Sequence, residues 1–150
     1  MSSADVEVTA SWSEPGPDPE AAEITALRVW HCSYASLAPV TQYANLRTLL
    51  VATYTDDDLE PVAALQGLEY LSLVHLPHVS DLAPLGQLTH LRTIRLATLP
   101  SWDSSGRVTV VDSLSPLALL PDLIHLELFG VRPTSKSLHD LESAPSLATV

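Results

Sequence analysis

A short spacing of apolar residues recurs through most of this chain and limits what the chain can fold into. Six segments follow the pattern apolar-x-x-apolar, and five of them continue with x-apolar. They are residues 24–29, 46–51, 68–73, 91–96, 123–128 and the shorter 147–150, so their first residues lie 22, 22, 23, 32 and 24 residues apart. Internal repeats of about this length are typical of stacked repeat architectures. We therefore expect a solenoid rather than an ordinary α/β domain with scattered leucines.

A second half-pattern runs in step with the first. Five segments carry apolar residues three apart, and the first four of them also have an early proline; they are residues 37–43, 59–65, 82–88, 114–120 and 138–144. In the first half-pattern, apolar residues two positions apart point to the same face of a strand. In the second, the spacing and the proline favour a short 3₁₀ or irregular helical turn, because a missing N–H costs little in a first turn.

One repeat cannot bury its leucines alone, but stacked repeats form a continuous leucine core. The predicted fold class is α/β: a solenoid with parallel strands on its concave face and short 3₁₀ or irregular turns on its convex face. A chain of 150 residues is long enough for one such domain and too short for two ordinary ones.

The segment 79–96, Val-Ser-Asp-Leu-Ala-Pro-Leu-Gly-Gln-Leu-Thr-His-Leu-Arg-Thr-Ile-Arg-Leu, resembles the repeats of the leucine-rich-repeat family. The resemblance is to its short bacterial class, which includes the internalins and the phosphatase-regulator type, and it covers residues 22–150. It implies a right-handed superhelix. The family usually has asparagine three residues after the last strand leucine, whereas that column here holds Cys32, Tyr54, Leu76, Leu99 and Val131. The family's asparagine ladder is therefore absent.

The chain divides into two expected parts. Residues 1–19 are interpreted as an N-terminal cap, with a strand over 6–12 followed by a proline-rich connector; the alternative is an acidic tail. The inward residues of that strand would be Val6, Val8, Ala10 and Trp12. Residues 20–150 are expected to form about five repeats and a stub. The stub fits a truncated chain, a frayed last repeat or an edge that pairs with another chain, and we rank pairing last, so we expect a monomer.

The long spacing of 32 residues contains an insertion over residues 100–109. Loops on a rigid scaffold often carry function, so Trp102 and Arg107 in this insertion are candidate anchors for a partner. The alternative is a tolerated insertion whose Trp102 packs back onto the solenoid.

The acidic balance excludes some classes of partner. The chain has 7 Lys and Arg against 18 Asp and Glu, a formal charge of −11. That balance argues against nucleic acid, which needs cationic side chains at its phosphates, and against anionic membrane surfaces. A single cysteine, Cys32, cannot form an internal disulfide, and residues 1–5 lack the features of a secretory signal. The expected location is the cytoplasm.

The strand residues between the core leucines predict a binding surface on the concave face. They form three columns across the repeats: Ala26, Thr48, Tyr70, Thr93, His125 and Thr149; then Arg28, Leu50, Ser72, Arg95 and Glu127; then Trp30, Ala52, Val74, Ala97 and Phe129. Aromatic residues beside arginine are typical of protein interfaces. The candidate partner-binding residues are Arg28, Trp30, Leu50, Tyr70, Val74, Arg95, Trp102, His125, Glu127 and Phe129.

Charge adds to this hypothesis. The strand stretches 24–30, 46–52, 68–74, 91–97 and 123–129 hold four arginines and two glutamates, a net +2 in a protein of −11. A partner with apolar groups and carboxylates would complement such a face. The alternative is that the arginines only cover the sheet with their aliphatic stems.

No motif predicts chemistry. His75 and His78 are separated by Pro77, which prevents a helix that would direct both at one metal, so neither a metal nor a cofactor is expected. The acidic run 56–58 lacks the ligand spacing of a calcium loop and instead fits a cap for the turn near Leu59. We expect a protein-interaction module and not an enzyme. The alternatives are a fragment of a longer repeat protein and, last, an enzyme that uses His125 and Glu127 as an acid/base pair.

Overall fold

The computed structural model describes the backbone of residues 4–9, 21–30, 38–52, 54, 56–76, 79–98 and 108–150. Of residues 4–9, 21, 30, 38 and 39 it describes the backbone only.

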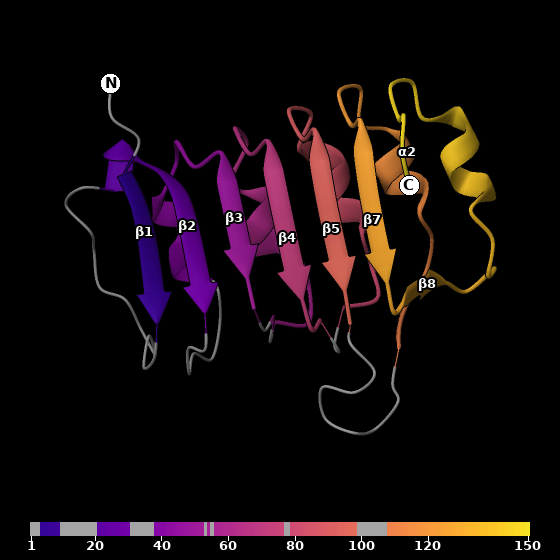
Figure 1. Cartoon of the computed structure of the whole chain (residues 1–150), viewed down its shortest axis with the longest axis horizontal. Coiled ribbons are helices and arrows are strands. Elements are labelled where there is room, and N and C mark those ends of the chain that lie inside the picture. The colour runs from indigo at the N-terminus through magenta and orange to yellow at the C-terminus, as the bar shows by residue number, and fades with distance from the viewer. Residues whose placement is uncertain are drawn as a thin grey trace.

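Within these residues, the chain forms one main sheet with helical turns on one side of it. The strands of that sheet, in spatial order, are β1 (Ala4–Thr9), β2 (Ile24–Trp30), β3 (Thr48–Val51), β4 (Tyr70–Val74), β5 (Thr93–Ala97) and β7 (His125–Phe129). Every neighbouring pair is parallel. Figure 1 shows these strands side by side in chain order, as a solenoid requires. The predicted α/β repeat solenoid is confirmed.

The second half-pattern forms the turns that return the chain from one strand to the next. These turns are η2 (Ala38–Gln42), α1 (Glu60–Ala63), η3 (Ala83–Gln87), α2 (Ser115–Ala118) and η4 (His139–Ser143), with η1 (Ala21–Glu23) before β2. Three of them are 3₁₀ and two are single α-helical turns, and all five lie at the expected positions. Proline occupies the first turn of α1, η3 and α2, where it costs no hydrogen bond.

A polar side chain lies one residue before the N-cap of four of these turns. In each case it accepts a hydrogen bond from the backbone N–H two residues later, at 2.9–3.1 Å; the acceptors are Asp58, Asp81, Ser113 and Ser137. Such bonds satisfy donors that the short turns leave unpaired. In the acidic run 56–58, Asp58 thus bonds the start of α1, although the N-cap itself is Leu59 and makes no side-chain cap bond.

The core lies between the sheet and the helical turns. The strand leucines and the apolar residues of the turns are almost all below 2% exposed and form one continuous cluster. Tyr54, in the column where the family has asparagine, is fully buried, and its hydroxyl donates to the carbonyl oxygen of Asp58 at 2.6 Å. Leu76 is also fully buried. The described part of this column thus packs into the core, and backbone bonds such as Tyr54 N–H to the His75 carbonyl link the coils.

The N-terminal strand belongs to the main sheet itself. We expected it over residues 6–12, and the structure has it as β1, Ala4–Thr9, paired with β2 along its whole length. Residues 10–20 lie outside the described part of the chain. That residues 1–19 form a separate N-terminal cap and connector stays a prediction.

Near the insertion the structure contains an element that the sequence analysis did not predict. β6 (Thr109–Val111) pairs in parallel with β8 (Val131–Pro133) in a small second sheet. The Thr109 hydroxyl hydrogen-bonds that of Thr98 and donates to the Leu76 carbonyl, so the described end of the insertion is anchored to neighbouring coils. Residues 99–107, with Trp102, lie outside the described residues.

Candidate functional site

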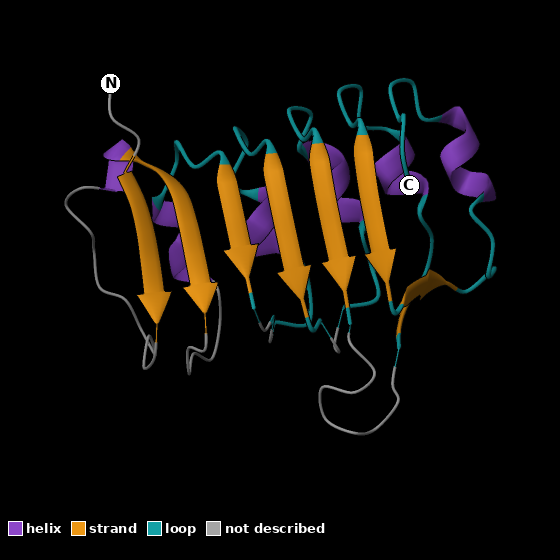
Figure 2. Ribbon diagram, viewed as in Figure 1, coloured by secondary structure: helices purple, strands orange, loops and turns teal. Residues whose placement is uncertain are grey.

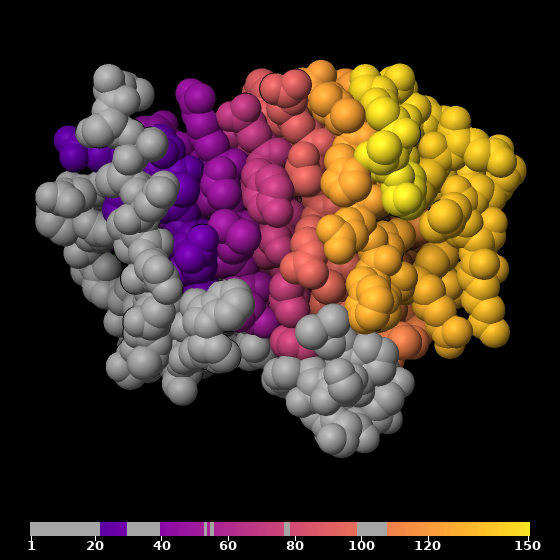
Figure 3. Space-filling model, in the orientation of Figure 1, coloured from indigo at the N-terminus to yellow at the C-terminus, as the bar shows by residue number. Residues whose placement is uncertain are grey.

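The candidate binding surface is the side of the main sheet turned away from the helical turns, which we call the open face. It corresponds to the face expected to be concave. In Figure 2 the strands lie in front of the helices, so this side of the sheet carries no helical layer. Figure 3 shows the same side with its side chains, and the C-terminal segment lies beside the residues of β7.

The strand register brings the predicted columns together. In the first column each residue from Ala26 to Thr149 is the direct partner of the next, and Tyr70 and His125 belong to it. The second column runs without a break from Arg28 to Glu127. Parallel strands in register place such residues about 4.8 Å apart on one face. The two columns are therefore confirmed as continuous rows across the coils.

Exposure along the open face is uneven. Phe129, at the end of β7, is 52% exposed, whereas Leu50, Tyr70 and Val74 are half-buried. Two small residues in the columns, Ser72 and Ala97, are buried. Ser72 is paired with Leu50 and Arg95, and Ala97 is paired with Val74 and Phe129. Small buried residues thus alternate with larger side chains on this face.

Polar side chains of the open face contact one another across the strands. Nε of Arg95 lies 3.2 Å from a carboxylate oxygen of Glu127, its partner in register, and both side chains are partly exposed. Nδ1 of His125 hydrogen-bonds the Thr149 hydroxyl. Thus His125 and Glu127, the pair considered for acid/base chemistry, each contact another residue.

The expected charge of +2 on the sheet needs correction because it left out β1. That strand contributes Asp5 and Glu7, and the Cα register pairs Glu7 with Arg28. With β1 included, the strand stretches hold four arginines and four acids, and their formal charge is 4 − 4 = 0. The sheet as a whole therefore carries no net positive charge.

Two candidate residues lack a side-chain description. The backbone of Trp30 ends β2 and pairs with Thr9, but nothing further is described of this residue. Trp102 lies outside the described residues.

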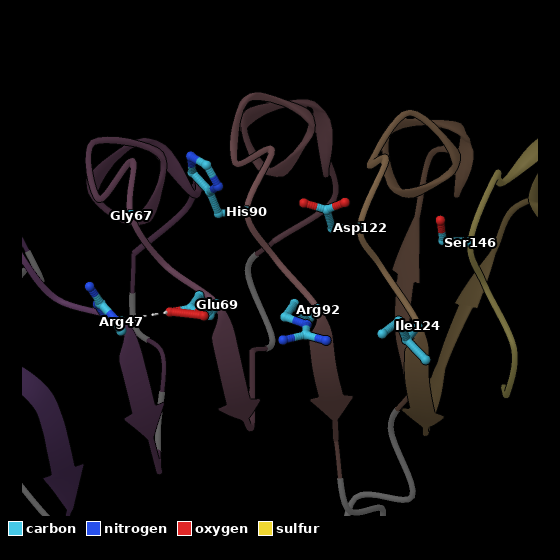
Figure 4. Close-up of a pocket in the computed structure, with 8 residues that line it drawn as sticks. All are labelled: Arg47, Gly67, Glu69, His90, Arg92, Asp122, Ile124 and Ser146. Atoms are coloured by element: carbon cyan, nitrogen blue, oxygen red, sulfur yellow. Dashed lines mark ion pairs between the residues drawn. The ribbon is translucent and has the colours of Figure 1, made fainter.

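A second hollow surface was missed by the sequence analysis. A cavity of about 660 Å³ lies where the strands begin, and we call it the edge groove. Its lining residues form two rows, which Figure 4 shows. The first row lies directly before the strands and consists of Arg47, Glu69, Arg92 and Ile124. The second row lies two positions earlier in each repeat and consists of Gly67, His90, Asp122 and Ser146. Both rows recur with the repeat spacing, so their positions could have been found from the sequence.

The described residues contain neither a metal cluster nor a membrane helix. No group of three or more His, Cys, Asp or Glu side chains in the described part of the chain could hold a metal ion. Likewise, none of the helices formed by those residues has the length and apolar character needed to cross a membrane.

Comparison with solved structures identifies the class of this fold. Internalin C2 from Listeria monocytogenes matches 87% of this chain with 25% sequence identity and a TM-score of 0.58. The fold is that of an internalin-like leucine-rich-repeat protein. Internalin F from the same organism matches 94% of the chain with 20% identity and a TM-score of 0.69. The resemblance inferred from the repeats is thereby confirmed.

The likeness covers only part of these internalins. This chain matches 54% of the internalin C2 chain and 38% of the internalin F chain. No protein-family model and no curated protein matches the sequence. For the internalin-like solenoid described here, function has to be argued from its own surfaces.

Proposed function

We propose that this chain is a protein-interaction module that binds a macromolecular partner on its open face, without enzymatic activity of its own. The observation that carries the proposal is the placement of Leu50, Tyr70 and Phe129 on one face of the sheet, which no helix of the described residues covers. Stacked repeats characteristically offer extended surfaces of this kind. Apolar side chains grouped on the surface of a water-soluble protein favour an interface over a purely solvated face.

Aromatic and charged groups lie next to each other on this face. Phe129 ends the third column beside Ala97, and the ion pair of Arg95 with Glu127 lies in the second column. Aromatic residues surrounded by satisfied polar groups are the usual composition of binding hot spots. We expect Phe129 and Tyr70 to contribute apolar contact, and the ion pair to exclude partners that cannot hydrogen-bond to it.

The remaining expectations stay predictions. A cytoplasmic location is proposed because the single cysteine, Cys32, cannot form an internal disulfide. A monomeric state is likewise a proposal.

The test is affinity capture from an extract of the producing organism, with quantitative mass spectrometry. Three baits are compared: wild type, the double variant Tyr70→Ala/Phe129→Ala, and Leu119→Ala. Leu119 is 72% exposed and follows α2 on the other side of the solenoid, so it controls for the loss of an exposed apolar residue. We expect at least one protein that wild type and Leu119→Ala retain and the double variant loses.

Equal retention by all three baits, or no specific retention by any, would count against the open face. Unfolding of each bait in urea shows whether it is folded, because a loss of binding is informative only for a folded bait.

A further inference from the structure

The edge groove differs from the open face in having a fixed pattern of alternating charge. Its first row is held by backbone hydrogen bonds from Glu69 N–H to the Arg47 carbonyl (2.8 Å) and from Arg92 N–H to the Glu69 carbonyl (2.8 Å). The same ladder continues from Ile124 N–H to the Arg92 carbonyl at 2.9 Å. The row therefore places a cation, an anion, a cation and an apolar residue about one strand spacing apart.

Arg92 is the cation of this row that has no acid of its own. Arg47 pairs with Glu69 at 3.8 Å, as the dashed line in Figure 4 shows. Arg92 is exposed and forms no ion pair or side-chain hydrogen bond with any residue that the structure describes. A guanidinium has five N–H donors, and a carboxylate satisfies two of them at once.

An apolar contact lies beside this cation. Ile124, the next residue of the row, is 40% exposed and lines the same groove. Two residues of the second row, Gly67 and Ser146, are small. The Ser146 hydroxyl donates a hydrogen bond to the Pro121 carbonyl at 2.6 Å. An exposed aliphatic side chain next to an arginine favours a protein ligand over a simple ion.

The acids of the groove narrow the choice of ligand. Glu69 lies on one side of Arg92 and Asp122 lines the groove above it in Figure 4. The lining has two arginines and two acids, a formal charge of 2 − 2 = 0 in a protein of −11. A polyanion such as nucleic acid would be repelled by these acids, whereas a single carboxylate with apolar or basic neighbours would not.

We infer that the edge groove is a second protein-binding surface, in which Arg92 pairs with one carboxylate of a partner segment and Ile124 contacts the apolar residue next to that carboxylate. Asp122 selects for a basic residue elsewhere in the segment. This surface adjoins the open face at Tyr70 and lies at the other end of the strands from Phe129.

The test uses a random peptide library displayed on phage and selected on the intact wild-type chain. Bound peptides are then measured by fluorescence anisotropy against Arg92→Glu and against Arg132→Glu. Arg132 is an exposed arginine of β8 outside the groove, so it is the matched control for charge reversal. We expect a class of peptides with one Asp or Glu next to an apolar residue, whose affinity falls about tenfold or more in Arg92→Glu and changes less than roughly twofold in Arg132→Glu.

A third variant, Phe129→Ala, separates the two surfaces, because Phe129 lies at the end of β7 that is away from the groove. Peptides that it still binds but Arg92→Glu does not would support the groove. If every selected peptide bound Arg92→Glu as tightly as wild type, or if Arg132→Glu weakened binding equally, the inference would be overturned, while the open-face proposal would stand or fall on the double variant alone. Matching urea midpoints of Arg92→Glu and wild type establish that the variant is folded.

Discussion

Gly130 is the residue whose replacement should reveal most directly how tightly the last coils are packed. It lies between β7 and β8 with φ of +63°, a conformation that costs a residue with a side chain about 1–2 kcal/mol. A Cβ atom at this position would lie 1.9 Å from the carbonyl oxygen of Thr98. Since that neighbour is backbone, no side-chain rotation can relieve the clash.

The cost follows from the bonds on either side of Gly130. The N–H of Thr98 donates to the Phe129 carbonyl at 2.7 Å, and the N–H of Thr109 donates to the Gly130 carbonyl at 2.7 Å. Losing one of these adds about 1 kcal/mol to the conformational strain. We therefore predict that Gly130→Ala lowers the free energy of unfolding by about 2–3 kcal/mol, which corresponds to a Tm lower by roughly 4–12 °C for a chain of this size.

Urea unfolding followed by far-UV circular dichroism measures this change, and Gly67→Ala is the matched control. A Cβ at Gly67 would meet only the Leu46 carbonyl oxygen at 3.7 Å, an ordinary contact. Alanine there should leave stability unchanged or raise it by about 0.4–1 kcal/mol, because it reduces the entropy of the unfolded chain. If both variants unfolded at the wild-type midpoint, the close approach of Gly130 to Thr98 would be refuted.

Two further predictions concern the core and the open face. Changing Leu71, the fully buried second residue of β4, to alanine should lower the stability of the protein by about 2–5 kcal/mol, whereas Leu119→Ala at a 72% exposed site should change it by less than about 0.5 kcal/mol; equal urea midpoints for the two would contradict a single packed core. In a double-mutant cycle with Arg95→Ala and Glu127→Ala, the coupling energy should not exceed about 1 kcal/mol and should fall with added salt, because both side chains are more than a third exposed; a larger, salt-independent coupling would show that the pair is shielded from water.

The repeating parts of the fold could be predicted from the sequence because each position was sampled several times. Leu71 in β4 and Leu85 in η3 each have counterparts one repeat away, so a chance match at one of them would not have misled the pattern. Features that occur once offered no such redundancy. The pairing of β6 with β8 joins Thr109 to Val131, and among the described residues these two strands are the ones that lie outside the main sheet.

The same position of the repeat shows why local geometry was harder to predict. Both His75 and Gly130 follow a strand by one residue and have positive φ, 60° and 63°. Glycine at such a position indicates a positive φ, but histidine does not, so only the backbone conformation at Gly130 could be predicted from the residue type. The expected charge of +2 covered five strand stretches and left out Asp5 and Glu7, because residues 1–19 were expected to form a separate cap.

The edge groove adjoins the open face at Tyr70, which directly follows Glu69, but Phe129 lies at the other end of the strands. Arg92 directly precedes β5, whereas Phe129 ends the adjacent β7, so their levels are five residues, about 16 Å, apart along the strands. Both are fixed by the backbone ladder of one rigid sheet, and changes at sites so far apart without shared contacts are usually additive. A large partner could contact Phe129 and Arg92 together, whereas a short segment would reach only one of them. On the proposed function, the open face recognises the shape of a partner and Arg92 in the groove recognises a carboxylate of the partner, so the two tasks fall to different residues.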